Sequence, residues 1–93
     1  MFEILTFRLA PGVDEATFRS LDERVQVEFA YQQPGFLRRT LGRDADGRWL
    51  VLTIWSDPDA ASAAERAFDR SALGATFRTL LADVAVERFH GVG

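Results

Sequence analysis

Hydrophobic and polar positions alternate most clearly in the middle of the chain, over residues 34–57. Residues 36–43 alternate large apolar with polar side chains, and residues 48–55 are rich in β-branched and aromatic ones. Between them, Asp44-Ala45-Asp46-Gly47 supplies residue types that tolerate the positive φ of a tight turn. The pattern predicts an antiparallel hairpin.

The register of this hairpin follows from the length of its loop. If four residues form the loop, Arg43 faces Arg48, and the pairs behind it are Gly42–Trp49, Thr40–Val51, Arg38–Thr53 and Phe36–Trp55. An aromatic ring over a strand glycine and an aromatic pair are favourable cross-strand neighbours. Two like charges at the closing pair oppose this register, although exposure would dilute their repulsion. We therefore predict that Arg38, Thr53, Phe36 and Trp55 share one face of the sheet.

The segments before the hairpin predict a strand and a helix. Residues 1–9 carry apolar side chains on both faces, and a Pro-Gly pair follows them. Over residues 14–30, apolar side chains recur at steps of three and four, at Phe18, Leu21, Val25 and Phe29. This stripe is typical of an amphipathic helix, for which Asp14 is a suitable N-cap.

The segments after the hairpin predict two helices and a strand. Asp57 can cap a helix that starts with Pro58 and covers residues 58–68. A shorter helix follows, and Gly74 is expected to weaken it by about 1 kcal/mol relative to alanine. Residues 84–90 form the last predicted strand.

The predicted order of elements is β-α-β-β-α-β within a single domain, residues 1–93. With short connections and right-handed crossovers, this order gives a ferredoxin-like α+β fold, an antiparallel sheet with its helices on one face. The other face of such a sheet is left open.

The third predicted strand is apolar on both sides. Trp49, Val51 and Trp55 lie on one side, and Leu50, Leu52 and Ile54 lie on the other. The helices can cover only one side, and a monomer rarely exposes an apolar patch of that size. We therefore expect the chain to form a homodimer through the open face of the sheet.

Composition narrows the classes of function. The 93 residues are 47% hydrophobic and 27% charged, which is ordinary for a globular domain. The net charge of −3 argues against a nucleic-acid partner, because no basic excess exists to neutralise phosphates. With no cysteine and one histidine, the chain is expected to hold neither a disulfide nor a metal site of Cys or His ligands. The N-terminus lacks a signal pattern and no apolar run reaches membrane-spanning length, so we expect a cytoplasmic protein without membrane contact.

Several motifs together resemble a known family. They are Pro34-Gly35-Phe36 at the start of the second strand, the short acidic turn, and Trp55-Ser56-Asp57 before an alanine-rich helix. This combination resembles the antibiotic biosynthesis monooxygenase-like branch of the dimeric α/β-barrel superfamily. The resemblance covers nearly the whole chain in element order, but only residues 34–68 in residue pattern. It implies two sheets that meet back to back in a dimer as a closed barrel, with one pocket per subunit between sheet and helices.

The resembled superfamily contains several kinds of enzyme. It includes cofactor-independent oxygenases of aromatic polyketides, haem-degrading monooxygenases, and isomerases and decarboxylases of small ring compounds. Trp55 is similar to the pocket tryptophan of the haem-degrading branch. That branch's first-strand asparagine would fall near Phe7 and its haem-ligating histidine near Glu65, and neither residue can take that role. The resemblance therefore implies a protein that does not degrade haem, and we expect no cofactor.

Two side chains, His90 and Arg38, are candidates for catalysis. His90 is the only side chain whose unperturbed pKa lies near neutrality, so it could act as a general base from the end of the last strand. A lone histidine beside a chain terminus is more often simply solvated. Arg38, among the aromatic residues of its predicted face, could hold a carboxylate or enolate oxygen, or it could pair with an acid at the sheet rim. Arg39 is expected to face the barrel and to pair with an acid of the partner chain.

Five residues are candidates for contact with a ligand: Trp55, Phe36, Thr53, Tyr31 and Trp49. The two tryptophans are large enough to wall an aromatic ligand, and they could equally be close-packed core. Tyr31 could orient a phenolic or quinoid ring with its hydroxyl, or lie at the surface with that hydroxyl in water. Phe36 and Thr53 belong to the set because the predicted register places them beside Trp55.

Two hypotheses for function follow. The first is a cofactor-independent, monooxygenase-like enzyme for an aromatic or polyketide-type substrate, whose own acidity supplies the carbanion that reduces oxygen. In that case the protein supplies a dry pocket, with Arg38 and His90 to stabilise charge. The second is a non-catalytic homodimer that binds a small apolar or aromatic ligand.

Overall fold

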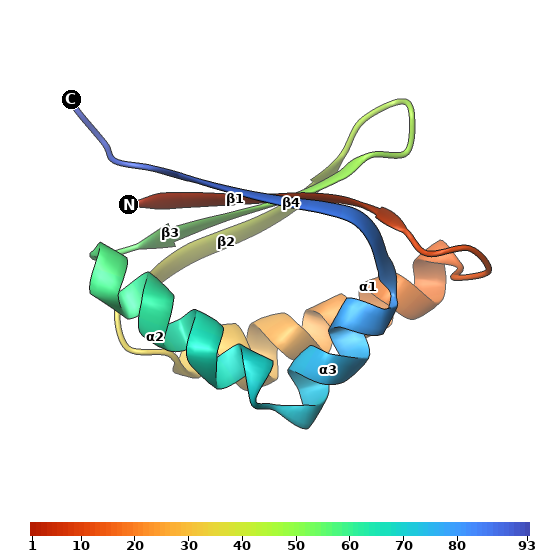
Figure 1. Cartoon of the computed structure of the whole chain (residues 1–93), viewed down its shortest axis with the longest axis horizontal. Helices are drawn as coiled ribbons and strands as arrows, with labels where there is room; N and C mark the ends of the chain where they lie inside the picture. The colour runs from red at the N-terminus through yellow and green to blue at the C-terminus, as the bar shows by residue number, and fades with distance from the viewer.

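The chain folds into two layers, a sheet and a set of helices, in a computed structural model that describes residues 1–93. The strands are β1 (Phe2–Leu9), β2 (Phe36–Arg43), β3 (Trp49–Trp55) and β4 (Leu81–Phe89), and they pair antiparallel in the order β2-β3-β1-β4. The helices are α1 (Glu15–Arg24), α2 (Pro58–Asp69) and α3 (Ala72–Thr79). All three lie against the same face of the sheet, and we call the uncovered face the open face (Figure 1). The predicted ferredoxin-like α+β fold is confirmed.

Helices α1 and α2 begin at the side-chain caps that the sequence indicates. At Asp14 and Asp57 a carboxylate oxygen accepts a hydrogen bond from the backbone N–H three residues later, at 2.7 and 2.8 Å. The Ser71 hydroxyl accepts the corresponding bond at 2.9 Å. A π-helical turn, Val25–Phe29, and a 3-10 turn, Ala30–Gln32, prolong α1 and complete the predicted first helix. No helix in the structure is both long enough and apolar enough to cross a membrane.

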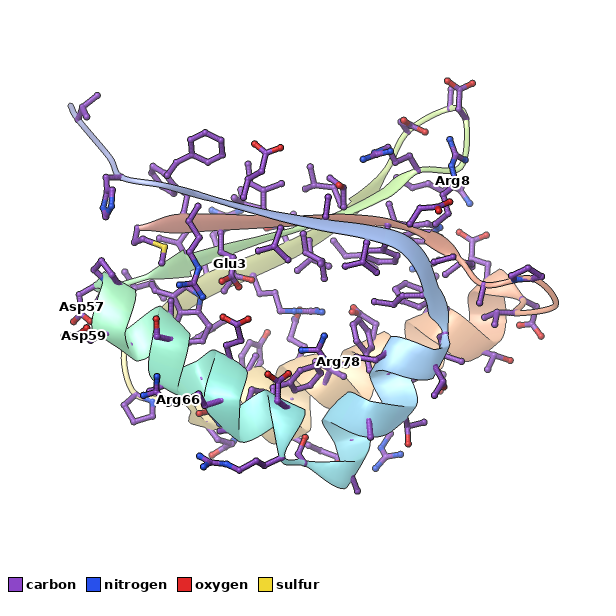
Figure 2. The ribbon with its side chains drawn as sticks, viewed as in Figure 1. Glu3, Arg8, Asp57, Asp59, Arg66 and Arg78 are labelled. Atoms are coloured by element: carbon purple, nitrogen blue, oxygen red, sulfur yellow. The ribbon has the colours of Figure 1, made fainter.

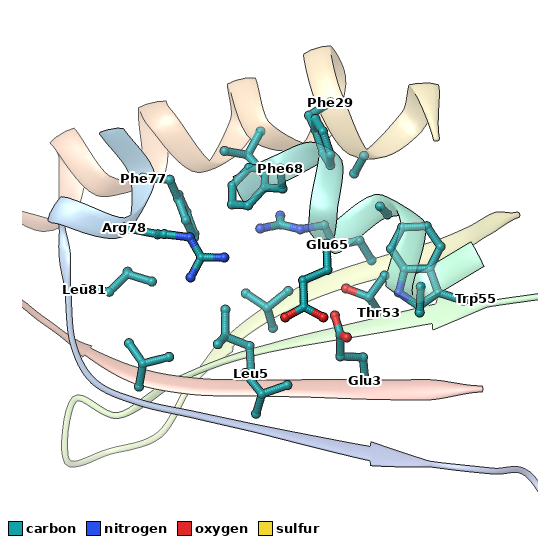
Figure 3. Close-up of a pocket in the computed structure, with 18 residues that line it drawn as sticks. Glu3, Leu5, Phe29, Thr53, Trp55, Glu65, Phe68, Phe77, Arg78 and Leu81 are labelled. Atoms are coloured by element: carbon teal, nitrogen blue, oxygen red, sulfur yellow. The ribbon is translucent and has the colours of Figure 1, made fainter. Parts of the chain in front are cut away.

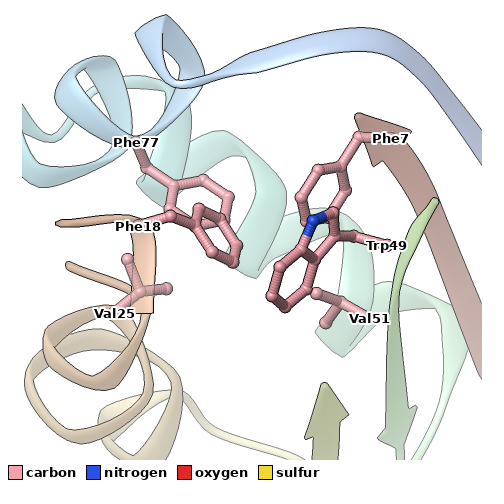
Figure 4. Packing of buried hydrophobic residues seen from close by; sticks show 6 residues of the cluster. All are labelled: Phe7, Phe18, Val25, Trp49, Val51 and Phe77. Atoms are coloured by element: carbon pink, nitrogen blue, oxygen red, sulfur yellow. The ribbon is translucent and has the colours of Figure 1, made fainter. Parts of the chain in front are cut away.

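The main hydrophobic core lies between the sheet and the helices α1 and α3 (Figure 4). Its six buried side chains are Phe7, Phe18, Val25, Trp49, Val51 and Phe77. The ring of Phe18 is central, with its centroid 5.0 Å from that of Trp49 and 5.4 Å from that of Phe7. A second, smaller cluster lies between β3 and α2 and consists of Trp55, Ala61 and Ala64.

Strand β3 shows the predicted difference between its two faces. Four of its side chains are buried under the helices, namely Trp49, Val51, Thr53 and Trp55. The alternate side chains, Leu50, Leu52 and Ile54, are half-buried on the open face. No helix covers that face in Figure 1, so the apolar surface predicted there is confirmed.

The hairpin register differs from the predicted one by a residue. Arg43 pairs with Trp49, whereas Arg48 belongs to the loop. The cause is the side chain of Asp44, whose Oδ1 accepts hydrogen bonds from the backbone N–H groups of both Asp46 and Arg48 at 2.9 Å. This Asx-type turn draws Arg48 into the loop and lengthens it.

A β-bulge at Leu37 absorbs the extra residue. Phe36 therefore pairs with Trp55, as predicted, while every pair between the bulge and the loop is shifted. A shift of one residue moves a side chain to the other face of a sheet. As a result, Arg38 lies on the open face and Arg39 on the helix-covered face, so the predicted placement of both arginines is wrong.

Candidate functional site

A cavity of about 250 Å³ lies between the sheet and the helices, in the space between the two buried clusters (Figure 3). Its walls come from all four strands, from α2 and α3, and from the π-helical and 3-10 turns that follow α1, and most of the lining side chains are apolar. This volume is close to the lower end of the range for small-molecule sites, about 300 Å³. The cavity is therefore of a size for a small aromatic ligand.

Small residues on α2 keep this space open opposite Trp55. Ala61 and Ala64 are buried there, with exposed fractions of 2% and 3%. They occupy one face of an alanine-rich helix that begins at the Asp57 cap. Larger side chains at these two positions would fill the volume beside the indole ring.

Trp55, which lines this cavity, carries a buried polar atom that is unsatisfied. Its indole Nε1 is buried and has no hydrogen-bond partner, and the whole residue is only 6% exposed. Figure 3 shows the indole nitrogen on the side of the ring that faces the cavity and Thr53. A buried donor without an acceptor costs about 1–3 kcal/mol. A ligand that brings an oxygen acceptor to this N–H would remove that cost.

A second polar group lies at the same end of the cavity and consists of Glu3, Glu65 and Arg88. We call it the Glu3 cluster. Arg88 Nε donates to Glu3 Oε2 at 3.0 Å, and Arg88 Nη2 donates to Glu65 Oε2 at 2.5 Å. Its third nitrogen, Nη1, donates to the Ser62 hydroxyl at 3.2 Å. One guanidinium on the edge strand β4 is thereby joined to both β1 and α2.

The environment of Glu3 shifts the pKa of its carboxyl group upward. Burial raises the pKa of Glu3 above its ordinary value, and the nearby Glu65 charge raises it further, while the charge and hydrogen bond of Arg88 act in the opposite direction. The Glu3 side chain is 22% exposed, whereas that of Glu65 is 50% exposed. Figure 3 shows both carboxyl groups directed toward the space that holds the Thr53 side chain. Glu3 is therefore the more sheltered carboxylate of the pair.

The opposite end of the cavity is bounded by Arg78 of α3. Its guanidinium forms an ion pair with Asp69 and lies over the ring of Phe68, 5.8 Å from the centroid. Figure 2 shows Glu3 and Arg78 on the inner side of the molecule, in the space between the sheet and the helices. The cavity thus carries negative charge at one end and a paired positive charge at the other.

A buried ion pair joins the cavity wall to α1. Arg39 Nη2 lies 2.5 Å from Asp22 Oδ1, and Nη1 donates to Asp22 Oδ2 at 3.0 Å. The two side chains are only 5% and 8% exposed. Gln26 Oε1 accepts a further hydrogen bond from Arg39 Nη1 at 3.4 Å. The predicted pairing of Arg39 with an acid of the partner chain is wrong, because the bulge turns this side chain toward the helices of its own chain.

The structure brings only some of the predicted ligand contacts to the cavity. Trp55 and Thr53 line it. Phe36 contacts Trp55 edge to face, with 5.8 Å between ring centroids, and Tyr31 contacts Phe36 in turn at 5.5 Å. Trp49 belongs to the main core instead. Phe36, Tyr31 and Trp49 are therefore outside the cavity lining.

The two predicted catalytic residues also lie outside the cavity. Arg38 pairs with Ile54 on the open face, where its side chain is exposed. His90 follows the end of β4 and is exposed as well. Their proposed part in catalysis stays a prediction, and the structure assigns neither of them to the cavity of its own chain.

Sequence reasoning missed the Glu3 cluster. One signal was available, because Glu3 alternates with Leu5 and Phe7 along β1 and so interrupts an otherwise apolar inward face. No local signal could have found the other two members. Arg88 lies 85 positions from Glu3 and 23 from Glu65, so only the folded sheet and helix bring them together.

Solved structures with the same fold cover nearly the whole chain. SnoaB, described as a cofactor-independent oxygenase from Streptomyces nogalater, is 22% identical with a TM-score of 0.74, over 98% of this chain and 93% of its own. A putative antibiotic biosynthesis monooxygenase from Caulobacter crescentus is 21% identical with a TM-score of 0.81, over 99% of this chain and 89% of its own. Rv0793 from Mycobacterium tuberculosis is 19% identical with a TM-score of 0.73, over 99% of this chain and 94% of its own.

At these identities the likeness shows the fold. It confirms that the chain has the fold of the antibiotic biosynthesis monooxygenase structures, as the motifs around Trp55 indicate. No family model matches the sequence, and no curated protein matches it significantly.

Proposed function

We propose that this protein is a small-molecule enzyme that oxygenates an aromatic, polyketide-type substrate without a cofactor. The observation that carries the proposal is the largely apolar cavity with an unpartnered Trp55 N–H beside a sheltered carboxylate, Glu3. An apolar space with few polar groups suits a flat aromatic ligand that must be held away from water. The fold shared with SnoaB, itself described as an oxygenase, supports the same reading.

The proposed reaction converts an activated CH₂ group of the substrate into a carbonyl group. A base removes one proton from this carbon, and the electron pair that remains spreads onto a neighbouring carbonyl oxygen. The carbanion passes one electron to O₂, and the two radicals combine to form a peroxide anion. The base returns its proton to the terminal oxygen of this peroxide. Loss of the second carbon-bound proton then breaks the O–O bond and leaves the new carbonyl group, and the departing hydroxide takes up that proton as water. The substrate and O₂ exchange four electrons, so no external reductant is needed.

Trp55 would stabilise charge in this reaction. The negative charge of the carbanion resides partly on its oxygen, and the indole N–H is a fixed donor with no competing partner. A donor already aimed at the place where charge develops stabilises a transition state without reorganisation. Removing one such donor typically lowers kcat by about 10²–10³-fold.

A second candidate function is a non-catalytic protein that binds the same class of ligand. The observation that favours it is the position of His90, the one histidine of the chain, which is exposed and lies outside the cavity. In that case the cavity and the Trp55 N–H would serve affinity alone.

Oxygen uptake with dithranol, a dihydroxyanthrone, separates the two functions. The rate of oxygen uptake in excess of the rate in buffer alone is measured for wild type and two variants. Trp55→Phe removes the indole N–H at the cavity, and Trp49→Phe makes the same change in the main core. We expect wild-type turnover that Trp55→Phe lowers and Trp49→Phe leaves intact. Binding without turnover, weakened by Trp55→Phe, would identify the binding protein. Absence of both would contradict both candidates.

We propose further that a second copy of the chain covers the open face. The centre of that face is apolar, with Ile4, Leu52 and Ile54 half-buried there. Its two edges carry opposite charges, Arg38 on β2 and Glu87 on β4, and neither forms a salt bridge within the chain. A two-fold axis along the strands would lay β2 of one protomer over β4 of the other and bring these charges together.

A further inference from the structure

Glu3 occupies a position that the fold would ordinarily give to an apolar side chain. Its neighbours on the inward face of β1 are Leu5 and Phe7, and its cross-strand partner is the buried Thr53 of β3. Burying a carboxylate is costly unless it is paired and hydrogen-bonded. Packing alone therefore does not explain why a glutamate occupies this position.

The pairing of Glu3 is incomplete. Its single charged partner is Arg88, and that guanidinium also serves Glu65 and the Ser62 hydroxyl. Two carboxylates thus share one positive charge at the polar end of the cavity. A carboxylate in this condition retains a strong tendency to accept a proton or a hydrogen bond.

We propose that Glu3 is the proton acceptor of this cavity, that Arg88 positions it, and that the ligand is a weak acid such as a phenol, enol or anthrone. The O–H or activated C–H bond of the ligand breaks, its proton passes to a Glu3 carboxylate oxygen, and the electron pair stays on the ligand as an enolate. The enolate oxygen then accepts the hydrogen bond of Trp55 Nε1. In the oxygenation that follows, Glu3 returns its proton to the terminal oxygen of the peroxide anion. Loss of the second carbon-bound proton then breaks the O–O bond, and the departing hydroxide takes up that proton as water.

Charges on every side of Glu3 bear on its proton affinity. Burial raises the pKa of Glu3, and Glu65 on α2 also raises it, whereas Arg88 on β4 lowers it. From the β2 side, Arg39 lines the same cavity, with its own charge paired to Asp22. A carboxylate whose pKa is raised is a stronger base than an ordinary one, which is what removal of a proton from a weak acid requires.

An anaerobic titration with dithranol tests this assignment. The anion of this probe absorbs at longer wavelength than the neutral form, and nitrogen prevents its oxygenation. We expect wild type to bind the probe and to show the anion band at a pH where free dithranol is neutral. Glu3→Gln, which keeps the shape of the side chain, should bind the probe in its neutral form. Glu23→Gln, an exposed acid on α1, should behave as wild type. An anion band retained in Glu3→Gln, or absent in wild type, would overturn the proposal.

Substitution of the charged neighbours of Glu3 gives a second test. If Glu3 had a purely structural role, these substitutions would not shift the pH at which the anion band appears. The pH midpoint for appearance of the anion band should rise in Arg88→Gln, because an opposite charge that lowers the pKa of Glu3 is removed. It should fall in Glu65→Gln, because a like charge is removed. Equal midpoints in both variants would contradict the assignment of Glu3 even if its own variant folded poorly.

Only the oxygenation step depends on the proposed function, so the two can fail separately. We expect Glu3→Gln to lower the rate of oxygen uptake by about 10²-fold or more, as for loss of a general base. Anion formation without oxygen uptake in air would contradict the oxygenase and support Glu3 as proton acceptor. Oxygen uptake that is unchanged in Glu3→Gln would support the oxygenase and contradict Glu3.

Discussion

Arg88 and Glu3 face each other on the neighbouring strands β4 and β1, and Arg88 Nε donates to Glu3 Oε2 at 3.0 Å. The same guanidinium reaches Glu65 on α2, so a single side chain ties the edge of the sheet to the helical layer. This link lies where the cavity meets the exposed strand β4, whose Val84 and Val86 contribute to the lining. The integrity of the cavity and the protonation of Glu3 therefore depend on the same contact.

Stability should depend on pH through Glu3 in a direction unusual for an acid. Burial, above all, raises the pKa of Glu3 in the folded state. Its contribution to the free energy of unfolding is therefore fully present below the ordinary pKa of glutamate, and it is lost as pH rises through the raised pKa. Relative to Glu3→Gln, wild type should lose stability between acidic and neutral pH, measured by urea denaturation at a series of pH values. A difference between the two proteins that does not vary with pH would contradict this.

Asp14 and Asp44 should show the opposite dependence. Backbone hydrogen bonds, from Thr17 to Asp14 and from Arg48 to Asp44, lower the pKa of each carboxyl. Their contribution is present above the ordinary pKa of aspartate and is lost as pH falls through the lowered pKa. The difference in free energy of unfolding between wild type and either variant, Asp14→Asn or Asp44→Asn, should therefore become smaller at acidic pH. A difference in free energy of unfolding from wild type that stays constant over the whole acidic range would contradict these roles of the Asp14 cap and the Asp44 turn.

Breaking the buried Arg39–Asp22 pair should be far more costly than breaking an exposed one. Arg39→Met leaves Asp22 as an uncompensated charge with an exposed fraction of only 8%, and such losses cost about 3–5 kcal/mol. The double variant Arg39→Met with Asp22→Leu should recover most of that loss, because no lone charge remains buried.

The matched control for that pair is Glu15→Gln, which removes the exposed partner of Arg43. Its effect should be at most about 1 kcal/mol. Urea denaturation of the four proteins gives each free energy of unfolding. Equal effects of Arg39→Met and Glu15→Gln would show that the buried pair contributes no more than a surface one.

Gly74→Ala should destabilise the protein, contrary to helix propensity. Propensity alone predicts a gain of about 1 kcal/mol for alanine in α3. In the fold, however, a Cβ at this position would lie 2.0 Å from the carbonyl oxygen of Phe68. Relief of such a clash requires backbone movement, so we expect a net loss of about 1–3 kcal/mol in thermal or urea unfolding. Ala75→Gly, at an exposed position of the same helix, measures the propensity term alone.

A charge exchange tests the assembly through the open face. Sedimentation velocity at micromolar concentration should show a dimer for wild type. Arg38→Glu should weaken it, Glu87→Arg should weaken it similarly, and the double exchange should restore it, because the two charges would again be opposite across the interface. Leu52→Arg, which places a charge in the centre of the apolar face, should give a monomer without loss of the fold. A monomeric wild type would contradict the proposal.

Local patterns in the sequence explain why so much of the fold was predictable. Strand and helix periods of two and 3.6 residues, and caps such as Asp14 and Asp57, act over a few neighbouring residues. Even the two-sided character of β3 follows from simple alternation. The register of the hairpin was not predictable in the same way, because the side chain of Asp44 rather than the number of loop residues decided it.

The sequence by itself determined the order of the elements, the apolar open face and the place of Trp55 at the end of β3, since each depends on residues close together in the chain. Only the tertiary structure decided that Arg39 pairs with Asp22 and that Arg88 joins Glu3 to Glu65. These contacts arise where distant strands and helices meet, and a bulge of one residue is enough to send a side chain to the opposite face. The cavity and its carboxylate are therefore products of the fold.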